Sequence, residues 1–219
     1  MLDQIISKTI NLKFGEVKDK KEEILDYFSK TFDLYSSLFE CLANDEAYYK
    51  KPNRLRHPLI FYYAHTAVFF INKLNASGFI QKRVDPYMES IMAIGVDEMS
   101  WDDLDDNSYD WPLVPEVLSY RQKVRSFIIN FIESCDFYLP IDEKSPLWII
   151  MMGIEHERIH LETSSVLIRE HRLSFVKDHA LWGRICEDDP SVCENELLEV
   201  DGGSVHPVSY THLTLPTKA

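Results

Sequence analysis

The sequence is poor in glycine, in paired cysteines and in long apolar runs, and each shortage excludes a class of protein. Glycine occurs 7 times in 219 residues, and alternating strands bounded by turn signals are missing until the end of the chain. The 4 cysteines show no C-x-x-C spacing, which argues against a zinc knuckle or a disulfide scaffold. No apolar stretch reaches the roughly 18 residues that span a bilayer, and residues 1–21 lack the apolar core of a signal peptide. We therefore expect a reduced, cytoplasmic protein.

Basic residues are also in short supply. The 23 lysines and arginines face 36 aspartates and glutamates, which gives a formal net charge of −13. A surface of that sign repels phosphate backbones and anionic lipid headgroups, so we expect neither nucleic acid nor a membrane as a partner. Hydrophobic residues nevertheless make up 45% of the chain and aromatic residues 12%. This composition is ample for a packed core and excludes a disordered protein.

What the sequence does contain is helical periodicity. Apolar residues recur at three- and four-residue steps in four segments, at about 20–43, 58–78, 115–134 and 145–169. The second segment begins at Pro58, a favoured first helical position, and stops near Gly78. Four such helices predict an all-α fold, an antiparallel four-helix bundle that extends over residues 20–170.

The rest of the chain has a different composition. We expect an N-terminal extension at 1–19, a linker at 171–196, the start of a truncated second domain at 197–205 and a vector-derived tail at 206–219. On this interpretation the chain is a fragment of a longer protein. An acidic connection at 85–111 separates the second and third helices. Its spacing does not match a calcium-binding loop, so we expect a solvated loop there.

The strongest chemical signal is the motif His156-Glu157-Arg158-Ile159-His160 in the fourth helix. Histidines four residues apart project from one face of a helix, one turn apart, so both imidazoles can reach one metal ion. His65, in the second helix, has only aromatic, small or apolar neighbours. In a bundle, such an inward-facing histidine could complete a site of three imidazoles. Of the other histidines near these helices, we expect His57, just before Pro58, to be a helix cap or a surface residue, and His171 and His179 to lie at the surface.

The residues alone leave two chemistries open. The motif reads H-E-x-x-H, in which Glu157 would act as the general base of a zinc protease. The longer protease pattern fails because Thr163 and Val166 occupy its glycine and histidine places, although a glutamate further along the chain could be the third ligand. Alternatively, three neutral imidazoles hold iron(II) and leave open positions for a substrate and O₂. A bundle with a purely structural metal is a third possibility.

Three runs of sequence resemble the N-terminal DinB-like domain of the 5-histidylcysteine sulfoxide synthases (OvoA) of ovothiol biosynthesis. They are Leu55–Leu74, Gly95–Leu104 and Glu155–Ser165. The resemblance extends from about Thr9 to Val205. Its first two runs favour this family over its ergothioneine-pathway relative, which shares the H-x-x-x-H-x-E pattern and the upstream His-Thr.

The resemblance implies a cofactor and a reaction. His65, His156 and His160 match the three ligands of the family's iron, so the expected cofactor is Fe²⁺. The family uses O₂ to couple the thiol of cysteine to the imidazole ring of histidine, and it oxidises the sulfur to a sulfoxide. Cysteine, histidine and O₂ are therefore the expected small-molecule partners.

The resemblance also changes what we expect of the two glutamates. Glu157 need not be a base, and we expect it to contact a metal ligand or to pair with Arg158 or Arg169. Glu162 is expected to accept a hydrogen bond from a ligand imidazole. The family's second domain, of the formylglycine-generating type, completes the substrate pocket, and we expect only its first strand here. This fragment should therefore bind iron weakly and show little activity, whereas its full-length parent should be active.

Overall fold

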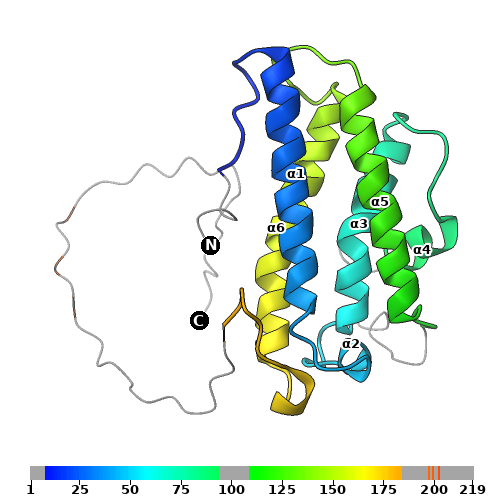
Figure 1. The fold of residues 1–219 in the computed structure, drawn as a ribbon, viewed down its shortest axis with the longest axis vertical. Helices are drawn as coiled ribbons and strands as arrows, with labels where there is room; N and C mark the ends of the chain where they lie inside the picture. The colour runs from blue at the N-terminus through cyan, green and yellow to red at the C-terminus, as the bar shows by residue number, and fades with distance from the viewer. Residues whose placement is uncertain (1–7, 94–108, 184–196, 198, 200–201, 203–219) are drawn as a thin grey trace, which may run out of the picture. The chain divides into compact units, whose positions relative to one another are not determined.

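The computed structural model describes residues 8–93 and 109–183, together with Leu197, Glu199 and Gly202. Within this part, four long helices form a bundle (Figure 1): α1 (Val17–Phe39), α3 (Leu59–Ala76), α5 (Val114–Ser134) and α6 (Pro146–Arg169). Three shorter elements lie in the connections: α2 (Glu46–Tyr49), α4 (Pro86–Ile91) and the 3₁₀ turn η4 (Leu173–Phe175). The described residues contain no strand. The all-α four-helix bundle is thus confirmed.

The long helices run in two directions. In Figure 1, α1 and α6 descend while α3 and α5 ascend. Hydrogen bonds agree, because the Tyr27 hydroxyl donates to Glu155 at 2.6 Å and, further along both helices, the hydroxyls of Tyr35 and Ser164 lie 3.0 Å apart. The pairs α3–α6 and α1–α5 pack antiparallel. Residues 77–113 return the chain to the end where α3 began, so α3 and α5 point the same way.

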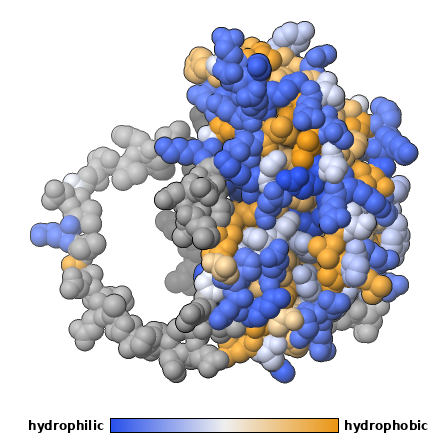
Figure 2. Space-filling view, in the orientation of Figure 1, coloured by the Kyte–Doolittle hydropathy of each residue, from blue (hydrophilic) through white to orange (hydrophobic). Residues whose placement is uncertain are grey.

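Helix α3 is the most buried element of the bundle. Most of its 18 residues are buried, and it packs against α5 and α6 as well as the short helices α2 and α4. A helix that is apolar on all sides belongs inside a protein. By contrast, α1 and α5 are amphipathic, and the face of the molecule in Figure 2 is mostly hydrophilic with hydrophobic residues in smaller groups. Polar residues of α3 are therefore held in the interior, where they need partners.

The ends of the first helix differ from the prediction. Helix α1 begins at Val17 and ends at Phe39 rather than near residue 43. It ends early because the chain then pairs with the segment after α6: Ala43 donates its N–H to the carbonyl of Phe175 at 2.9 Å, and Lys177 donates to that of Cys41 at 2.8 Å. Residues 171–183 are therefore docked on the bundle, although the sequence suggested a linker there.

The chain divides into a unit of Met1–Ile185, which contains every helix of the described residues, and a second unit of Cys186–Ala219. In the second unit only Leu197, Glu199 and Gly202 belong to the described residues. Apart from these three residues, the expected second-domain strand at 197–205 lies outside the described residues, as do the tail at 206–219 and the run Gly95–Leu104. No described helix has both the length and the apolar character needed to cross a membrane.

The start of the acidic connection is more ordered than a solvated loop. Asp85 caps α4 by accepting hydrogen bonds from two backbone N–H groups at 3.1 Å each, and Pro86 stands at the first helical position. Glu89 is only 1% exposed, and its Oε1 accepts the N–H groups of Val84 and Asp85 at 2.9 Å each. Helix α4 is therefore a fixed part of the bundle.

Candidate metal centre

Three histidines from two helices converge inside the bundle. His65 lies on α3, and His156 and His160 lie one turn apart on α6. Their candidate ligand nitrogens all lie within 4.8 Å of one another, and among the described residues no other group of three histidines, cysteines or carboxylates could hold a metal ion. The Nε2 atoms of His156 and His160 are 3.1 Å apart, and the His65 ring centroid is 5.1 Å from each of the other two. We refer to these residues as the histidine cluster.

Aromatic rings and helix packing fix how the imidazoles point. Phe69 stacks on His156 with centroids 3.9 Å apart and planes inclined by 14°, and Phe61 stacks on His65 at 5.1 Å and 18°. Both phenylalanines belong to α3, which packs antiparallel against α6. The apolar neighbours that made His65 conspicuous in the sequence are therefore the groups that hold two of the rings.

A backbone carbonyl selects which nitrogen of His65 faces the other rings. His65 Nδ1 lies 2.7 Å from the carbonyl oxygen of Met92, the residue that ends α4. A carbonyl only accepts, so Nδ1 carries the proton and Nε2 keeps its lone pair. Histidines that bind metals usually donate their second nitrogen in this way. The sequence carries no signal for the role of Met92, because nothing local in the sequence brings it to His65.

Burial holds His156 and His160 in their neutral form. Burial lowers the pKa of His156 to about 2, with repulsion from His160, His65 and Lys73 acting in the same direction. Burial also lowers the pKa of His160 to about 4, with a further contribution from His65. Neutral imidazoles are the form that binds metal ions, because the lone pair is free.

The spacing of the two donor atoms on α6 fits one shared ion. Two nitrogens that bind a metal at about 2.1 Å lie about 3.0 Å apart at a right angle and about 3.4 Å apart at a tetrahedral angle. The separation of 3.1 Å between the two Nε2 atoms on α6 falls in this range. The buried Nδ1 atoms of His156 and His160 have no hydrogen-bond partner in the described part of the chain. The metal-ligand role of the cluster stays a prediction that this geometry fits.

Glu157 does not belong to the histidine cluster. It is fully buried, and its Oε1 lies 3.0 Å from Arg121 Nη2 and accepts the Thr66 hydroxyl proton at 3.0 Å. The expected pairing with Arg158 or Arg169 is wrong, because the partner comes from α5. A general base must reach the water it deprotonates, but this carboxylate is fully buried, its Oε1 is bound by Arg121 and Thr66, and its buried Oε2 has no hydrogen-bond partner among the described residues. The arrangement thus disfavours the zinc-protease interpretation.

Glu162 lies elsewhere on α6. Its side chain is exposed, and no hydrogen bond from His156 Nδ1 or His160 Nδ1 is present among the described residues. The expected bond from a ligand imidazole to Glu162 is therefore not found in this part of the chain. Glu187, Glu194 and Glu196, the downstream glutamates considered for a zinc site, lie outside the described residues.

Two of the histidines expected at a helix cap or at the surface are buried instead. His57 is 2% exposed, with the rings of Phe61, Tyr109 and Trp111 packed around it. His171 is 8% exposed, and its Nε2 donates to a backbone carbonyl at 2.9 Å. Residues distant in sequence cover both side chains, which local polarity could not reveal. His179 pairs with an exposed glutamate at 3.1 Å.

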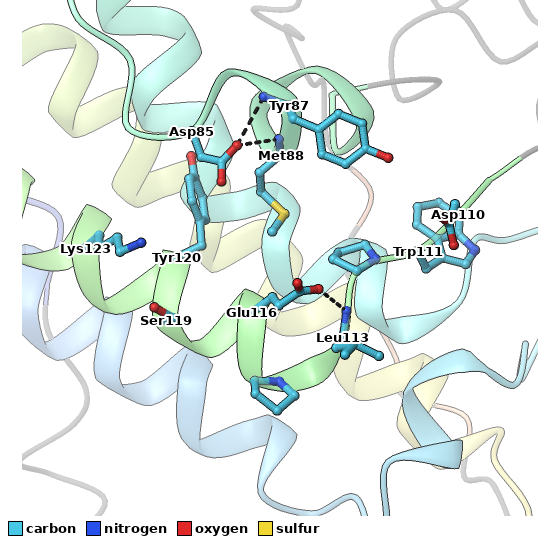
Figure 3. Close-up of a pocket in the computed structure, with 12 residues that line it drawn as sticks. Asp85, Tyr87, Met88, Asp110, Trp111, Leu113, Glu116, Ser119, Tyr120 and Lys123 are labelled. Carbon is cyan, nitrogen blue, oxygen red and sulfur yellow. Dashed lines mark hydrogen bonds between the residues drawn. The ribbon is translucent and has the colours of Figure 1, made fainter.

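A cavity of about 340 Å³ reaches the histidine cluster at His160. Its polar lining includes Arg56 and Glu170, and Phe61 and Tyr62 supply aromatic walls. A larger cavity of about 690 Å³ lies between α4 and α5 and is not lined by any of the three histidines (Figure 3). Two carboxylates of the larger cavity serve as helix caps. The smaller cavity is the one associated with the candidate metal centre, because His160 lines it.

Comparisons with known proteins concern the helical bundle that contains the three histidines. The sequence model of the DinB superfamily matches residues 27–164, a range that contains the whole histidine cluster. Ergothioneine biosynthesis protein 1 of Neurospora crassa is 24% identical over 139 residues. This match covers 59% of the present chain and 15% of the relative, so the chain spans a small part of that relative's length.

Proposed function

The chain belongs to the DinB superfamily, and from that premise we propose that His65, His156 and His160 hold one Fe²⁺ ion that serves an O₂-dependent sulfoxide synthase. The observation that carries the proposal is the convergence of three imidazoles with no carboxylate among them; burial lowers the pKa of two of these imidazoles, His156 and His160. A neutral ligand set leaves the metal its full charge, which favours an anionic thiolate as the substrate ligand. When bound, the iron would supply the site where the thiolate and O₂ react.

The proposed reaction couples cysteine to the imidazole ring of histidine. The S–H bond of cysteine and one ring C–H bond are replaced by a C–S bond, and the sulfur gains one oxygen atom. O₂ accepts the electrons of both changes, and its second oxygen leaves with the two protons as water. The resemblance of Leu55–Leu74 to ovothiol-pathway enzymes supports histidine as the acceptor. The matched relative is named for ergothioneine biosynthesis, which makes trimethylated histidine the competing acceptor.

The side chains of this chain have three tasks in the proposal. The histidine cluster holds the ion, the Met92 carbonyl fixes the proton of His65 on Nδ1, and the 340 Å³ cavity admits a small substrate toward His160. Arg56 and Glu170 in the cavity lining carry opposite charges. They complement the carboxylate and the ammonium group of an amino acid, which is the substrate class proposed.

Anaerobic reconstitution tests the proposal. We expect one Fe²⁺ per chain, and we expect cysteine, but not serine, to produce a thiolate-to-metal charge-transfer band. O₂ consumption should then require both cysteine and histidine, with the sulfoxide identified by mass spectrometry. Preferential retention of zinc together with peptide hydrolysis would refute the proposal.

A further inference from the structure

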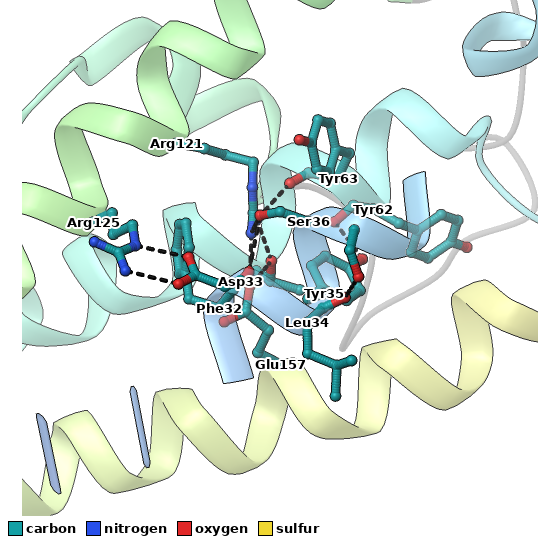
Figure 4. A network of polar contacts seen from close by, with 12 residues as sticks. Phe32, Asp33, Leu34, Tyr35, Ser36, Tyr62, Tyr63, Arg121, Arg125 and Glu157 are labelled. Carbon is teal, nitrogen blue, oxygen red and sulfur yellow. Dashed lines mark hydrogen bonds and ion pairs between the residues drawn. The ribbon is translucent and has the colours of Figure 1, made fainter. Parts of the chain in front are cut away.

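A second polar cluster lies next to the histidine cluster and joins three helices. Arg121 of α5 is 2% exposed, and its Nη2 donates to Glu157 Oε1 of α6 at 3.0 Å (Figure 4). Its Nη1 donates to the hydroxyl of Thr66 of α3 at 2.9 Å, and that hydroxyl donates to the same glutamate oxygen at 3.0 Å. We call Arg121, Glu157 and Thr66 the Arg121 cluster.

The guanidinium of Arg121 is fixed in one orientation. Its carbon lies 4.1 Å from the Phe32 ring centroid and 4.8 Å from that of Tyr63. It also donates to the Tyr63 carbonyl at 2.9 Å and to the Ser36 hydroxyl at 3.0 Å. A planar guanidinium packed between rings presents its donors in a rigid fork. The partners on α3 and α6 must therefore meet it at set positions.

Stability alone is a poor explanation for such a cluster. Removing two opposite charges from water costs free energy that their attraction often fails to recover, and apolar residues of the same volume can replace a buried pair without loss. The best-attested use of a buried polar contact is to select one register between packed helices. The positions of Thr66 and Glu157 in the sequence show that the Arg121 cluster holds α3 and α6 in register.

Each member on a metal-bearing helix directly follows a histidine. Thr66 follows His65 on α3, and Glu157 follows His156 on α6. Neighbouring residues on an α-helix are rotated by about 100°, so each helix turns one residue to the histidine cluster and the next to Arg121. A rotation or slide of one helix against the other would separate Thr66 from Glu157 and also the imidazoles.

We propose that Arg121, Glu157 and Thr66 are positioning residues that set the register between α3 and α6 at which His65 meets His156 and His160. The inference rests on the proposed metal site. None of the three residues needs to touch the ion. Their effect is to hold three imidazoles at the spacing that one ion requires.

Conservative variants test this role. Thr66→Val keeps the shape of the side chain but removes the hydroxyl, and Glu157→Gln removes only the charge. Both should lower the affinity for Co²⁺ about 10-fold or more, as loss of a contact that orients a ligand does, and should change the visible spectrum of the bound Co²⁺. Thr66→Ser should restore both. A merely structural role would change unfolding without changing the spectrum.

Arg125 provides the matched control. One turn further along α5, it forms a bidentate pair with Asp33 of α1 at 2.8 Å for both contacts (Figure 4). Arg125→Met therefore breaks an arginine–carboxylate link between helices that does not involve α3 or α6. We expect its Co²⁺ affinity and spectrum to equal those of the wild type. Equal losses in Arg125→Met and Thr66→Val would overturn the inference, and so would folded variants of the Arg121 cluster with wild-type affinity and spectrum.

The outcomes separate this inference from the proposed function. If Glu157→Gln does not fold, the comparison of Thr66→Val with Thr66→Ser decides. If the wild type binds no metal, the proposed site fails, and the Arg121 cluster is then tested in the metal-free chain by ¹⁵N–¹H NMR of the imidazole rings. Thr66→Val should shift the resonances of His156 and His160, whereas Arg125→Met should not. Unshifted resonances in Thr66→Val would refute the positioning role.

Discussion

His65 Nδ1 and the carbonyl oxygen of Met92 lie 2.7 Å apart, and this contact connects the histidine cluster to α4. The position of Met92 depends on how α4 is held. The side chain of Glu89, one turn earlier, accepts hydrogen bonds from the N–H groups of Val84 and Asp85 at 2.9 Å each. The backbone carbonyl of Glu89 accepts a hydrogen bond from the side chain of Asn72 of α3 at 2.8 Å. A buried carboxylate outside the metal site therefore supports the orientation of one imidazole.

The first prediction concerns this carboxylate. Glu89→Ala should destabilise the protein by about 1–3 kcal/mol, because two partly buried N–H groups and the buried hydroxyl of Tyr120 lose their acceptor. Metal affinity should fall as well, since a displaced Met92 no longer fixes His65. Urea denaturation and a Co²⁺ titration measure the two effects. Glu46→Ala, which removes an exposed glutamate paired with Lys50 at 3.6 Å, is the control and should change neither. Unaltered unfolding in Glu89→Ala would contradict the account of α4.

The second prediction concerns the cost of the histidine cluster without metal. The buried Nδ1 atoms of His156 and His160 have no hydrogen-bond partner among the described residues. His156→Leu should therefore be as stable as the wild type or more stable when no metal is present. Metal at about 100 times its Kd should stabilise the wild type by about 2.7 kcal/mol and should not stabilise the variant.

Calorimetry with and without Fe²⁺ under anaerobic conditions measures this difference. His179→Ala is the matched control, because this histidine pairs with Glu40 away from the cluster, and it should keep the full metal-dependent shift in Tm. A metal-dependent shift that persists in His156→Leu would mean that the ion binds elsewhere.

The sequence was sufficient to locate the histidine cluster. His156 and His160 are recognisable from their spacing alone, and His65 from its apolar neighbours, because both signals are local. The contact between them depends on α3 and α6 packing antiparallel, which helical periodicity makes plausible but does not specify. Met92 had no local signal, since it approaches His65 through the fold of α4.

The buried charges had a signal that the sequence analysis overlooked. Arg121 lies on the same stripe as Val117, Val124 and Ile128, at helical spacing among buried residues of α5. Glu157 similarly continues the buried stripe of α6. Opposite charges on two apolar stripes predict a buried ion pair. The sequence does not identify the partner of Glu157, because Arg121, Arg158 and Arg169 are all candidates. Only the packing of α5 decides among these three arginines.

The third prediction tests how closely α3 and α6 approach. Gly153 precedes His156 by one turn, and a Cβ at this position would overlap the ring of Phe70 on α3. Gly153→Ala gains about 1 kcal/mol of helix propensity, but overpacking a dense core costs about 1–3 kcal/mol. Because the obstacle is an aromatic ring held inside the bundle, we expect net destabilisation in urea denaturation, with weaker metal binding.

A double-mutant cycle identifies the obstacle. Phe70→Leu should cost stability by itself, yet it should make Gly153→Ala less harmful, so the two changes should be coupled favourably by about 0.5–3 kcal/mol. Met152→Ala, at an exposed neighbouring position, gives the background cost of a substitution on α6. Strictly additive effects of Gly153→Ala and Phe70→Leu would show that the ring is not the constraint.

The last prediction addresses substrate recognition in the 340 Å³ cavity. Arg56 lines this cavity together with His160, so it should bind the carboxylate of an amino acid whose thiolate reaches the metal. Arg56→Met should weaken cysteine binding to the Co²⁺-loaded chain about fivefold, a modest effect because the guanidinium is exposed to solvent.

Cysteamine has the same thiol but no carboxylate, so its affinity should not change. The thiolate-to-cobalt absorption band measures both titrations. Arg54→Met removes an equally exposed charge that does not line the cavity, and it should leave both ligands unaffected. Equal weakening of cysteine and cysteamine in Arg56→Met would show that the arginine acts on the metal site rather than on the carboxylate.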